Sequence, residues 1–425
     1  MNEKSPKENR YQEKQKKQNK GKQRTQKQYN QKQSEPKQHN QKQHRQKKHE
    51  LKKHEQKQHK QKQDEQETSI VNGRRQKTRR VFYGQVAVGG EAPISVQSMT
   101  NTDTRDVEAT VAQIEELTAA GCDIIRVAVP DMSSAAALEQ IKQRISIPLI
   151  ADIHFDYRLA LEAVKKGVDG LRINPGNIAK KEHVKQIVAA AGKAEIPIRV
   201  GVNSGSIEDD ILQKYGQPTA RGMVESALGQ VEVLETESFN QIVISLKATD
   251  IWMTKRACSL LAREVDYPLH IGITEAGSGM SGIIKSAAGL GTLLLDGLGD
   301  TLRVSLTGDP LTEVKVGREL LEVLDLSQRR PRVISCPTCA RTGVDLVKLT
   351  EDVKQAVSGI EQPITVAVMG CAVNGPGEAR EADIGIAAGK GEGIIFKNGE
   401  KIKKVAEEKL VSALKSEIKN LRGAE

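Results

Sequence analysis

Residues 148–174 read PLIADIHFDYRLALEAVKKGVDGLRIN and contain two short apolar runs on either side of a helical pattern. The first run leads into Asp152 and His154, and the second leads into Arg172 and Asn174. A strand, a helix and a second strand in this order are typical of a βαβ unit with parallel strands. This stretch therefore predicts a parallel sheet whose strands end in polar residues.

Similar units recur from about residue 80 onward. Eight apolar, β-branched runs are candidate strands, at 94–97, 123–129, 148–155, 170–174, 197–203, 242–247, 270–275 and 301–306. The segments between them carry helical patterns, as in 107–119, where Asp106 is the expected N-cap. Eight βα units of regular spacing predict a TIM barrel over residues 75–328. A doubly wound open sheet is the alternative, but no G-x-G-x-x-G follows the first strand.

The pattern changes after residue 326, where QRRPR at 328–332 forms a polar, proline-containing linker. Residues 333–425 then predict a small α+β domain. Its expected elements are a helix near 345–357, strands at 364–369 and 383–388, a hairpin around 397–400 and a C-terminal helix from about 405 to 421.

The N-terminal segment differs from both domains. Residues 1–68 carry 21 Lys and Arg against 9 Asp and Glu, whereas residues 69–425 carry 44 against 46. With so few apolar side chains the segment is expected to be a disordered, solvated extension. Its histidines recur at every fifth position, from His39 to His59. A metal store and weak binding to nucleic acid through the basic charge are the alternatives.

Composition also limits the cellular context. No stretch approaches the roughly 18 apolar residues of a membrane-spanning helix, and no apolar secretory segment is present, so we expect a soluble, cytoplasmic protein. The five cysteines, an odd number, favour reduced thiols that serve metal binding or catalysis. Cys122 and Cys258 fall in a strand and a helix and are expected to be buried packing residues.

The other three cysteines lie in the second domain, as Cys336-Pro-Thr-Cys339 and Cys371. A C-x-x-C pair lets two thiolates reach one metal from a tight loop. Glu378 follows Cys371 after a Gly-Pro-Gly turn that can fold its carboxylate back toward the same metal. An iron–sulfur cluster with three thiolates and one oxygen ligand fits this set better than zinc, which prefers Cys and His. Zinc, or no metal, remains the alternative.

Polar and charged side chains interrupt the ends of the predicted barrel strands, where TIM-barrel active sites lie. Five of them are cations from different strands: Arg126, Arg172, Arg199, Lys247 and Arg303. Buried cations without counter-charges are costly, so their convergence calls for an anion such as a phosphate or diphosphate. Further polar residues at these ends are 97–101, Asp152, His154, Asn174, Asn203, Glu275 and Ser305.

These motifs resemble the 4-hydroxy-3-methylbut-2-en-1-yl diphosphate synthase family of the non-mevalonate isoprenoid pathway. The resemblance spans residues 75–425 and is most specific at SCPTC (335–339) and GCAVNGPGE (370–378). RINPGN (172–177), RVGVN (199–203) and SVQSMTN (95–101) support it. The absence of the plant-type insert between the two domains indicates the bacterial, two-domain form.

The resemblance implies a reaction and a site. It implies a [4Fe-4S] cluster held by Cys336, Cys339, Cys371 and Glu378, with Glu378 also catalytic because the substrate oxygen takes its place. The implied reaction is the two-electron reductive opening of 2-C-methyl-D-erythritol 2,4-cyclodiphosphate, with electrons from flavodoxin or ferredoxin. It also implies a homodimer in which one chain's cluster domain closes over the partner's barrel. The implied substrate-binding residues are Arg126, Arg172, Asn174, Arg199, Asn203, Lys247, Arg303 and Ser305.

Two rival functions stay open at this point. One is a polyanion-binding protein in which the basic extension acts and the remainder is an inactive scaffold. The other is a zinc-dependent hydrolase built on the barrel. No proposed cluster ligand is missing from the chain, which argues against the first. Metal content would separate the second from an iron–sulfur enzyme.

Overall fold

The computed structural model describes residues 75–174, 178, 181–327, 331–360, 364–371 and 382–422. The predicted disorder of residues 1–68, the core of the linker and Glu378 lie outside these ranges. Within them, no helix combines the length and the apolar character needed to cross a membrane.

Parallel strands form the larger domain. In the described residues the strands are β3 (Ser95–Met99), β4 (Ile124–Ala128), β5 (Leu149–Asp152), β6 (Gly170–Ile173), β7 (Ile198–Asn203), β8 (Ile242–Lys247), β9 (His270–Ile271) and β10 (Thr301–Leu302). Their order around the sheet is β8-β7-β6-β5-β4-β3-β10-β9. The Ile244 N–H donates to the Pro268 carbonyl at 2.9 Å and joins β8 to the chain entering β9. The strands thus form the predicted TIM barrel.

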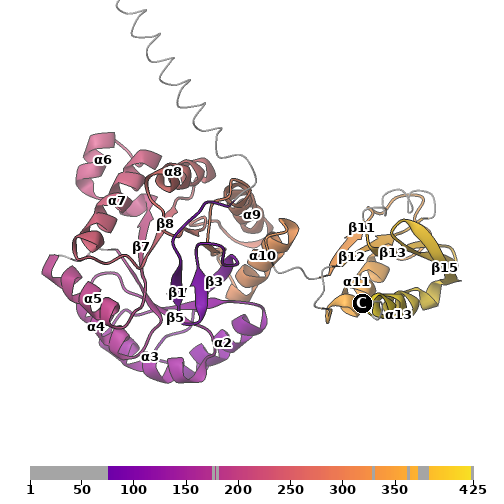
Figure 1. Cartoon of the computed structure of the whole chain (residues 1–425), viewed down its shortest axis with the longest axis horizontal. Coiled ribbons are helices and arrows are strands. Elements are labelled where there is room, and N and C mark those ends of the chain that lie inside the picture. The colour runs from indigo at the N-terminus through magenta and orange to yellow at the C-terminus, as the bar shows by residue number, and fades with distance from the viewer. Residues whose placement is uncertain are drawn as a thin grey trace, which may run out of the picture. The chain divides into compact units, whose positions relative to one another are not determined.

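Helices surround these strands (Figure 1). They are α2 (Val107–Ala119), α3 (Met132–Arg144), α4 (Tyr157–Lys165), α5 (Lys181–Lys193), α6 (Asp209–Tyr215), α7 (Ala220–Thr236), α8 (Ile251–Glu264), α9 (Gly279–Leu295) and α10 (Pro310–Val323). The structure confirms α2 with its predicted bounds. Asp106 caps it by accepting a hydrogen bond from the Ala109 N–H at 3.0 Å. Val111, Ile114 and Leu117, at helical spacing, are buried against the barrel.

The last two barrel strands are shorter than the sequence predicts. We expected strands at 270–275 and 301–306, but β9 ends at Ile271 and β10 at Leu302. Isolated bonds continue beyond them, such as the Arg303 N–H to the Ile271 carbonyl at 3.0 Å. At Glu275, the last residue of the first predicted strand, φ is +51°, so the backbone there is not extended.

A hairpin that the sequence analysis missed precedes the barrel. It pairs β1 (Val81–Tyr83) with β2 (Val86–Val88) in antiparallel register. Tyr83 is fully buried and packs with Ile124, Ile150 and Val243, which lie at the N-terminal ends of their strands. The hairpin therefore closes that end of the barrel and leaves the carboxyl end as the side where a site can form.

The C-terminal domain contains a mixed sheet. Within the described ranges its strands are β11 (Arg332–Ser335), β12 (Thr365–Met369), β13 (Ile384–Gly389), β14 (Glu392–Lys397) and β15 (Glu400–Ala406), in that order across the sheet. The first three run parallel, and β14 and β15 are antiparallel additions. The predicted hairpin at 397–400 is confirmed, since Asn398 and Gly399 both have positive φ, as a tight two-residue turn requires.

Two details of this domain correct the sequence analysis. Strand β11 was not predicted, and the helix expected from about 405 begins only at Leu410, as α13 (Leu410–Arg422). Residues 400–406 pair with β14 instead, because the turn at 398–399 directs them back along that strand. Helix α11 (Leu346–Val357) agrees with the expected 345–357, and Asp345 caps it.

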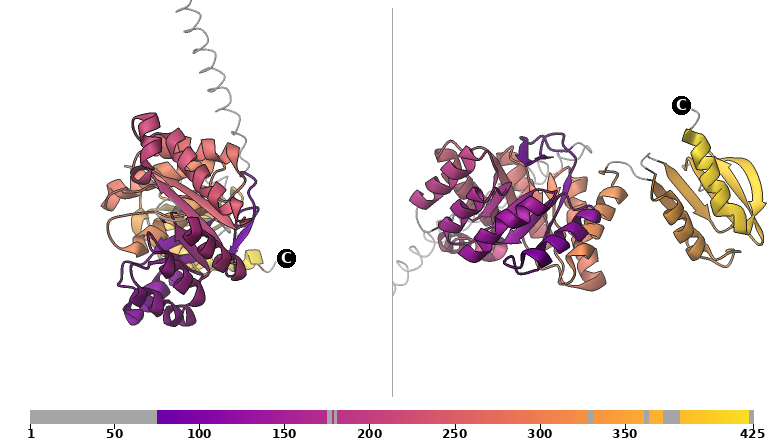
Figure 2. Two further views of the ribbon diagram at one scale, coloured as in Figure 1. Left: turned by 90° about the vertical axis from the view of Figure 1, so that its left-hand side faces the viewer. Right: turned by 90° about the horizontal axis from the view of Figure 1, so that it is seen from below.

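The two helices described in this domain, α11 and α13, pack on one face of its sheet. Val353 of α11 and Leu414 of α13 are buried with Val366, Ile386 and Ile395 of the strands. Figure 2 shows the two helices side by side, in agreement with their contacts. The alternate strand residues, including Ala367 and Phe396, form a smaller cluster on the other face. This alternation is what a sheet with one well-covered face requires.

Candidate functional site: a cationic barrel mouth and a cysteine edge

The structure brings the five predicted cations together inside the barrel, in a region called here the mouth, which extends from Arg199 near the start of β7 to Lys247 and Arg303 at the carboxyl ends of their strands. Arg126, Arg172 and Arg199 lie on β4, β6 and β7 and are almost fully buried, with exposed fractions of 9%, 8% and 1%. Lys247 ends β8, and Arg303 directly follows β10. The four arginines are close enough that they help to lower the pKa of Lys247 well below its ordinary value, after the larger effect of burial.

Asp152, at the end of β5, compensates two of these cations. Its Oδ1 lies 3.2 Å from Arg172 Nη1, and its Oδ2 lies 3.7 Å from Arg126 Nε. Burial acts to raise the pKa of this carboxyl, but the arginines and the His154 hydrogen bond prevail and hold it well below its usual range. Asp152 is therefore a permanent carboxylate that holds two arginine side chains in place.

Glu313 compensates a third cation, and sequence analysis did not find it. It lies in the first turn of α10, is 3% exposed, and receives Arg303 Nη2 and Nε at 3.2 Å each. It also accepts the Leu306 N–H at 2.8 Å, which fixes the loop after β10. A glutamate on an outer helix gives no sequence signal of this kind, because only the packing of α10 directs it inward.

The remaining two cations have neutral partners. Arg199 Nη1 donates to Gln97 Oε1 at 2.6 Å, and Lys247 Nζ lies 3.1 Å from His270 Nε2. Burial lowers the pKa of Arg199 to about 10. Among the described residues, the ion pairs of the mouth thus join two carboxylates to three of the five cations and leave Arg199 and Lys247 without a carboxylate partner. The mouth has excess positive charge and suits a multiply charged anion.

The other predicted site residues surround the mouth with less definite roles. Asn174 is buried directly after β6, and Ser305 is half-buried two residues after Arg303. Asn203 ends β7, and its backbone N–H donates to Ser206 Oγ at 3.1 Å. Glu275 is exposed and accepts a hydrogen bond from Thr249 Oγ1 at 2.9 Å.

The three cysteines of the C-terminal domain gather near the carboxyl ends of β11 and β12, a region called here the cysteine edge. Cys336 directly follows β11, and Cys371 follows β12 after Gly370. The Gly370 N–H donates to Cys336 Sγ at 3.3 Å, so the two strand ends are adjacent. Cys339 is exposed, and backbone and side-chain hydrogen bonds from Arg341 and Thr342 lower the pKa of its thiol. All three thiols are free.

The donor set at this edge fits a metal group with thiolate ligands. Three free cysteine sulfurs supply the soft ligands that iron–sulfur and zinc sites use, and hydrogen bonds lower the pKa of one of them, Cys339. In the described ranges, no three His, Cys, Asp or Glu side chains stand close enough to hold a metal ion. The position of Glu378 lies outside those ranges. By contrast, Cys122 and Cys258 are buried as predicted, and burial raises both thiol pKa values to about 12.

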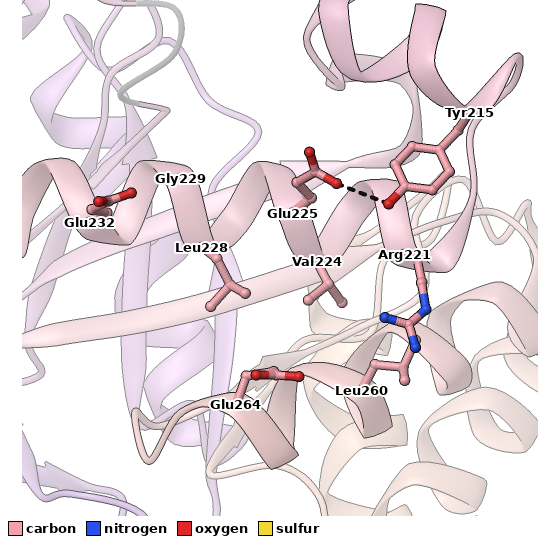
Figure 3. A pocket seen from close by; sticks show the side chains of 9 residues that line it. All are labelled: Tyr215, Arg221, Val224, Glu225, Leu228, Gly229, Glu232, Leu260 and Glu264. Atoms are coloured by element: carbon pink, nitrogen blue, oxygen red, sulfur yellow. Dashed lines mark hydrogen bonds between the residues drawn. The ribbon is translucent and has the colours of Figure 1, made fainter. Parts of the chain in front are cut away.

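A separate groove of about 420 Å³ lies on the outer helices, along α7 and α8 (Figure 3). Tyr215 borders it and donates to Glu225 at 2.9 Å, while Leu228 and Leu260 line it. It contains none of the predicted site residues.

Family models match both domains of the chain. Residues 78–318 match the GcpE TIM-barrel domain, and residues 332–420 match the GcpE protein C-terminal domain. The chain belongs to the GcpE family. It is 58% identical over 347 residues to a protein of Geobacter sulfurreducens, covering 82% of this chain and 98% of that one. A protein of Clostridium acetobutylicum is 56% identical over 348 residues, with coverage of 82% and 100%.

Both relatives are named 4-hydroxy-3-methylbut-2-en-1-yl diphosphate synthase (flavodoxin), and GcpE enzymes are iron–sulfur proteins of isoprenoid biosynthesis. Among solved structures, a dihydropteroate synthase from Stenotrophomonas maltophilia aligns with a TM-score of 0.44 and 14% identity, over 58% of this chain and 97% of that one. That similarity is too weak to inform the reaction.

Proposed function

We propose that this GcpE chain converts 2-C-methyl-D-erythritol 2,4-cyclodiphosphate to (E)-4-hydroxy-3-methylbut-2-enyl diphosphate. The reaction opens the ring reductively, removes one hydroxyl as water and consumes two electrons. The observation that carries the proposal is the mouth, where two carboxylates pair with three of the five cations among the described residues. The chain is similar over 82% of its length to enzymes named for this product, which supports the same conclusion.

The mouth would bind the cyclic diphosphate through its cations. Arginine forks and a lysine ammonium match phosphate oxygens, and their partial burial strengthens each contact. Because Asp152 and Glu313 already orient three of the arginines, little side-chain entropy remains to be lost on binding. The proposed binding residues are Arg126, Arg172, Asn174, Arg199, Asn203, Lys247, Arg303 and Ser305.

The cysteine edge would hold a [4Fe-4S] cluster through Cys336, Cys339, Cys371 and Glu378. When bound, such a cluster supplies the electrons and a Lewis-acidic iron. Among the described residues, the Gly370 N–H donates to Cys336 Sγ and helps to orient that sulfur. Glu378 is the proposed exchangeable ligand, whose oxygen the substrate replaces, and in that sense it is catalytic.

The proposed partners follow from the same reaction. Reduced flavodoxin would supply the electrons, as in the names of the relatives, with ferredoxin as the alternative donor. We further propose a homodimer that works in the cytoplasm. Binding of nucleic acid would involve only the basic segment 1–68, which carries 21 Lys and Arg.

Metal analysis and turnover test the proposal together. Protein purified without oxygen should contain about four iron and four sulfide per chain, as a [4Fe-4S] cluster requires, and should consume the cyclodiphosphate with reduced flavodoxin. Glu378→Ala should retain iron, lose it more readily in air and turn over little. Cys258→Ala, which alters a buried thiol away from the edge, should match the unmodified protein. Stoichiometric zinc without iron would instead favour a zinc-dependent hydrolase.

A further inference from the structure

Lys247 differs from the other cations of the mouth in the partner that holds it. Asp152 and Glu313 form ion pairs with Arg126, Arg172 and Arg303. In the described part of the mouth, the recorded hydrogen-bond partner of Lys247 is an imidazole, with 3.1 Å between Lys247 Nζ and His270 Nε2. His270 lies on β9 and is 1% exposed, so the rigid barrel sets the position of its ring.

The surroundings of His270 keep its ring neutral. Burial is the largest cause of a pKa well below the ordinary value, and the charges of Lys247, Arg199, Arg126 and Arg303 lower it further. Burial and the neighbouring arginines lower the pKa of Lys247 as well, but the negative charge of a bound diphosphate opposes them and favours the ammonium form of Lys247 in the complex. An ammonium has only donors, so Nε2 must accept and the ring proton must lie on Nδ1.

Two further features bear on the contact between Lys247 and His270: the space around the lysine end and the second ring nitrogen of the histidine. A Cβ at Gly272 would lie 2.7 Å from Lys247 Nζ, so the lysine end occupies space that only a glycine leaves free. His270 Nδ1 is buried and has no hydrogen-bond partner in the described structure. A buried Nδ1–H without a partner costs free energy, which the contact between Nε2 and the Lys247 ammonium must offset.

We propose that His270 is a positioning residue, which orients the Lys247 ammonium toward the diphosphate of the substrate without neutralising it. A carboxylate at the same place would orient the ammonium equally well but would cancel its charge. An apolar residue would preserve the charge but release the side chain. A buried neutral imidazole supplies a hydrogen-bond acceptor for the ammonium without adding a negative charge. This inference rests on the proposed function, because it assigns a partner to one of the proposed binding residues.

The test is binding of inorganic diphosphate to the whole, cluster-containing chain by titration calorimetry, together with kcat and KM. His270→Leu removes the acceptor and should weaken diphosphate binding about tenfold, since a hydrogen bond to a charged group is lost. His270→Gln keeps an acceptor oxygen near the position of Nε2 and should stay within about threefold. His270→Glu should weaken binding more than His270→Leu. In each variant KM should rise while kcat changes less.

A double-mutant cycle with Lys247→Met separates positioning from general packing. If His270 acts through Lys247, adding His270→Leu to Lys247→Met should weaken diphosphate binding no further. His183→Leu is the control, because His183 stacks on Tyr157 at 3.8 Å on the outer helices and should leave binding unchanged. Fully additive losses, or equal losses in the Leu and Gln variants, would overturn the proposal.

A measurement on the unmodified protein covers the case in which a variant fails to fold. ¹⁵N spectra of labelled histidine near pH 7 should show one neutral ring protonated at Nδ1, and that signal should shift when inorganic diphosphate is added. A charged ring, or a proton on Nε2, would contradict the proposal. Absence of turnover with intact diphosphate binding would count against the proposed reaction alone and leave the role of His270 standing.

Discussion

The mouth of the barrel and the cysteine edge both reach the carboxyl ends of parallel strands, yet they are organised differently. In the mouth, each cation has a protein partner, such as Asp152 for Arg172 or Gln97 for Arg199. At the edge, Cys339 is exposed, and the sulfurs have short-range partners from neighbouring loops, such as the Gly370 N–H for Cys336 and Arg341 for Cys339. The mouth is therefore preorganised by packing, whereas we expect the proposed cluster to order the edge when it binds.

The largest expected effect is a loss of iron at the cysteine edge that leaves anion binding at the mouth unchanged. Cys371→Ser should abolish most of the iron content and turnover, because it removes one of the proposed sulfur ligands of the cluster. Binding of inorganic diphosphate, measured by calorimetry, should remain within about threefold of the unmodified protein. Full iron content and turnover would show that Cys371 is not a ligand.

The next effect concerns the carboxylate that holds two arginines. Asp152→Asn should lower the free energy of unfolding by about 3 kcal/mol, since it leaves buried charges uncompensated. Asp156→Asn, four residues later, alters an exposed ion pair with Arg158 and should cost less than about 1 kcal/mol. Urea denaturation measures both. Equal losses in the two variants would mean that the mouth is not a network of buried charges.

The same residue gives the stability a defined pH dependence. The folded-state pKa of Asp152 is depressed, so its stabilisation is complete above the unfolded-state value of about 4 and is lost as the pH falls through the lower folded-state value. The difference in unfolding free energy between the unmodified protein and Asp152→Asn should therefore shrink only in acid. If this difference in unfolding free energy shrank at about pH 6 to 8 instead, the group that titrates would be a histidine and not Asp152.

A smaller effect tests whether the carboxylates limit anion binding. Glu313→Gln keeps an oxygen for the Leu306 N–H but removes the charge beside Arg303. We expect a loss of about 2 kcal/mol in unfolding free energy and roughly threefold tighter diphosphate binding at low salt. Weaker diphosphate binding would show that orientation by the carboxylate matters more than the excess of charge.

The smallest effect lies at the N-terminal end of the barrel strands. A Cβ at Gly170 would lie 2.4 Å from Tyr83 Cε1, so Gly170→Ala should displace the hairpin and cost about 1–2 kcal/mol. Diphosphate binding should change by less than about threefold, because Tyr83 interacts electrostatically with Arg199 and Arg126 but its hydroxyl forms no hydrogen bond to them in the described structure. Gly192→Ala is the control, since nothing lies within 4 Å of that Cβ position. A larger fall in diphosphate affinity in Gly170→Ala would mean that the hairpin and the mouth are coupled.

Local patterns predicted much of this molecule. The alternation of apolar runs and helices predicted the barrel, and Asp106 predicted the start of α2. Short elements failed, since three-residue strands such as β1 and β2 contain too few residues to show a period. The predicted start of the C-terminal helix was wrong, because the turn at 398–399 leads residues 400–406 back along β14 and they join the sheet instead.

The sequence by itself determined which chemical groups are available. Cysteine spacing and cations at strand ends are local features, set by a few neighbouring residues and the two-residue period of a strand. Only the tertiary structure decided which groups meet. Gln97 lies 102 residues from Arg199, Ser98 lies 215 residues from Glu313, and His270 meets Lys247 across neighbouring strands. Such pairs form because the barrel closes, and closure depends on the packing of the whole domain rather than on any segment of it.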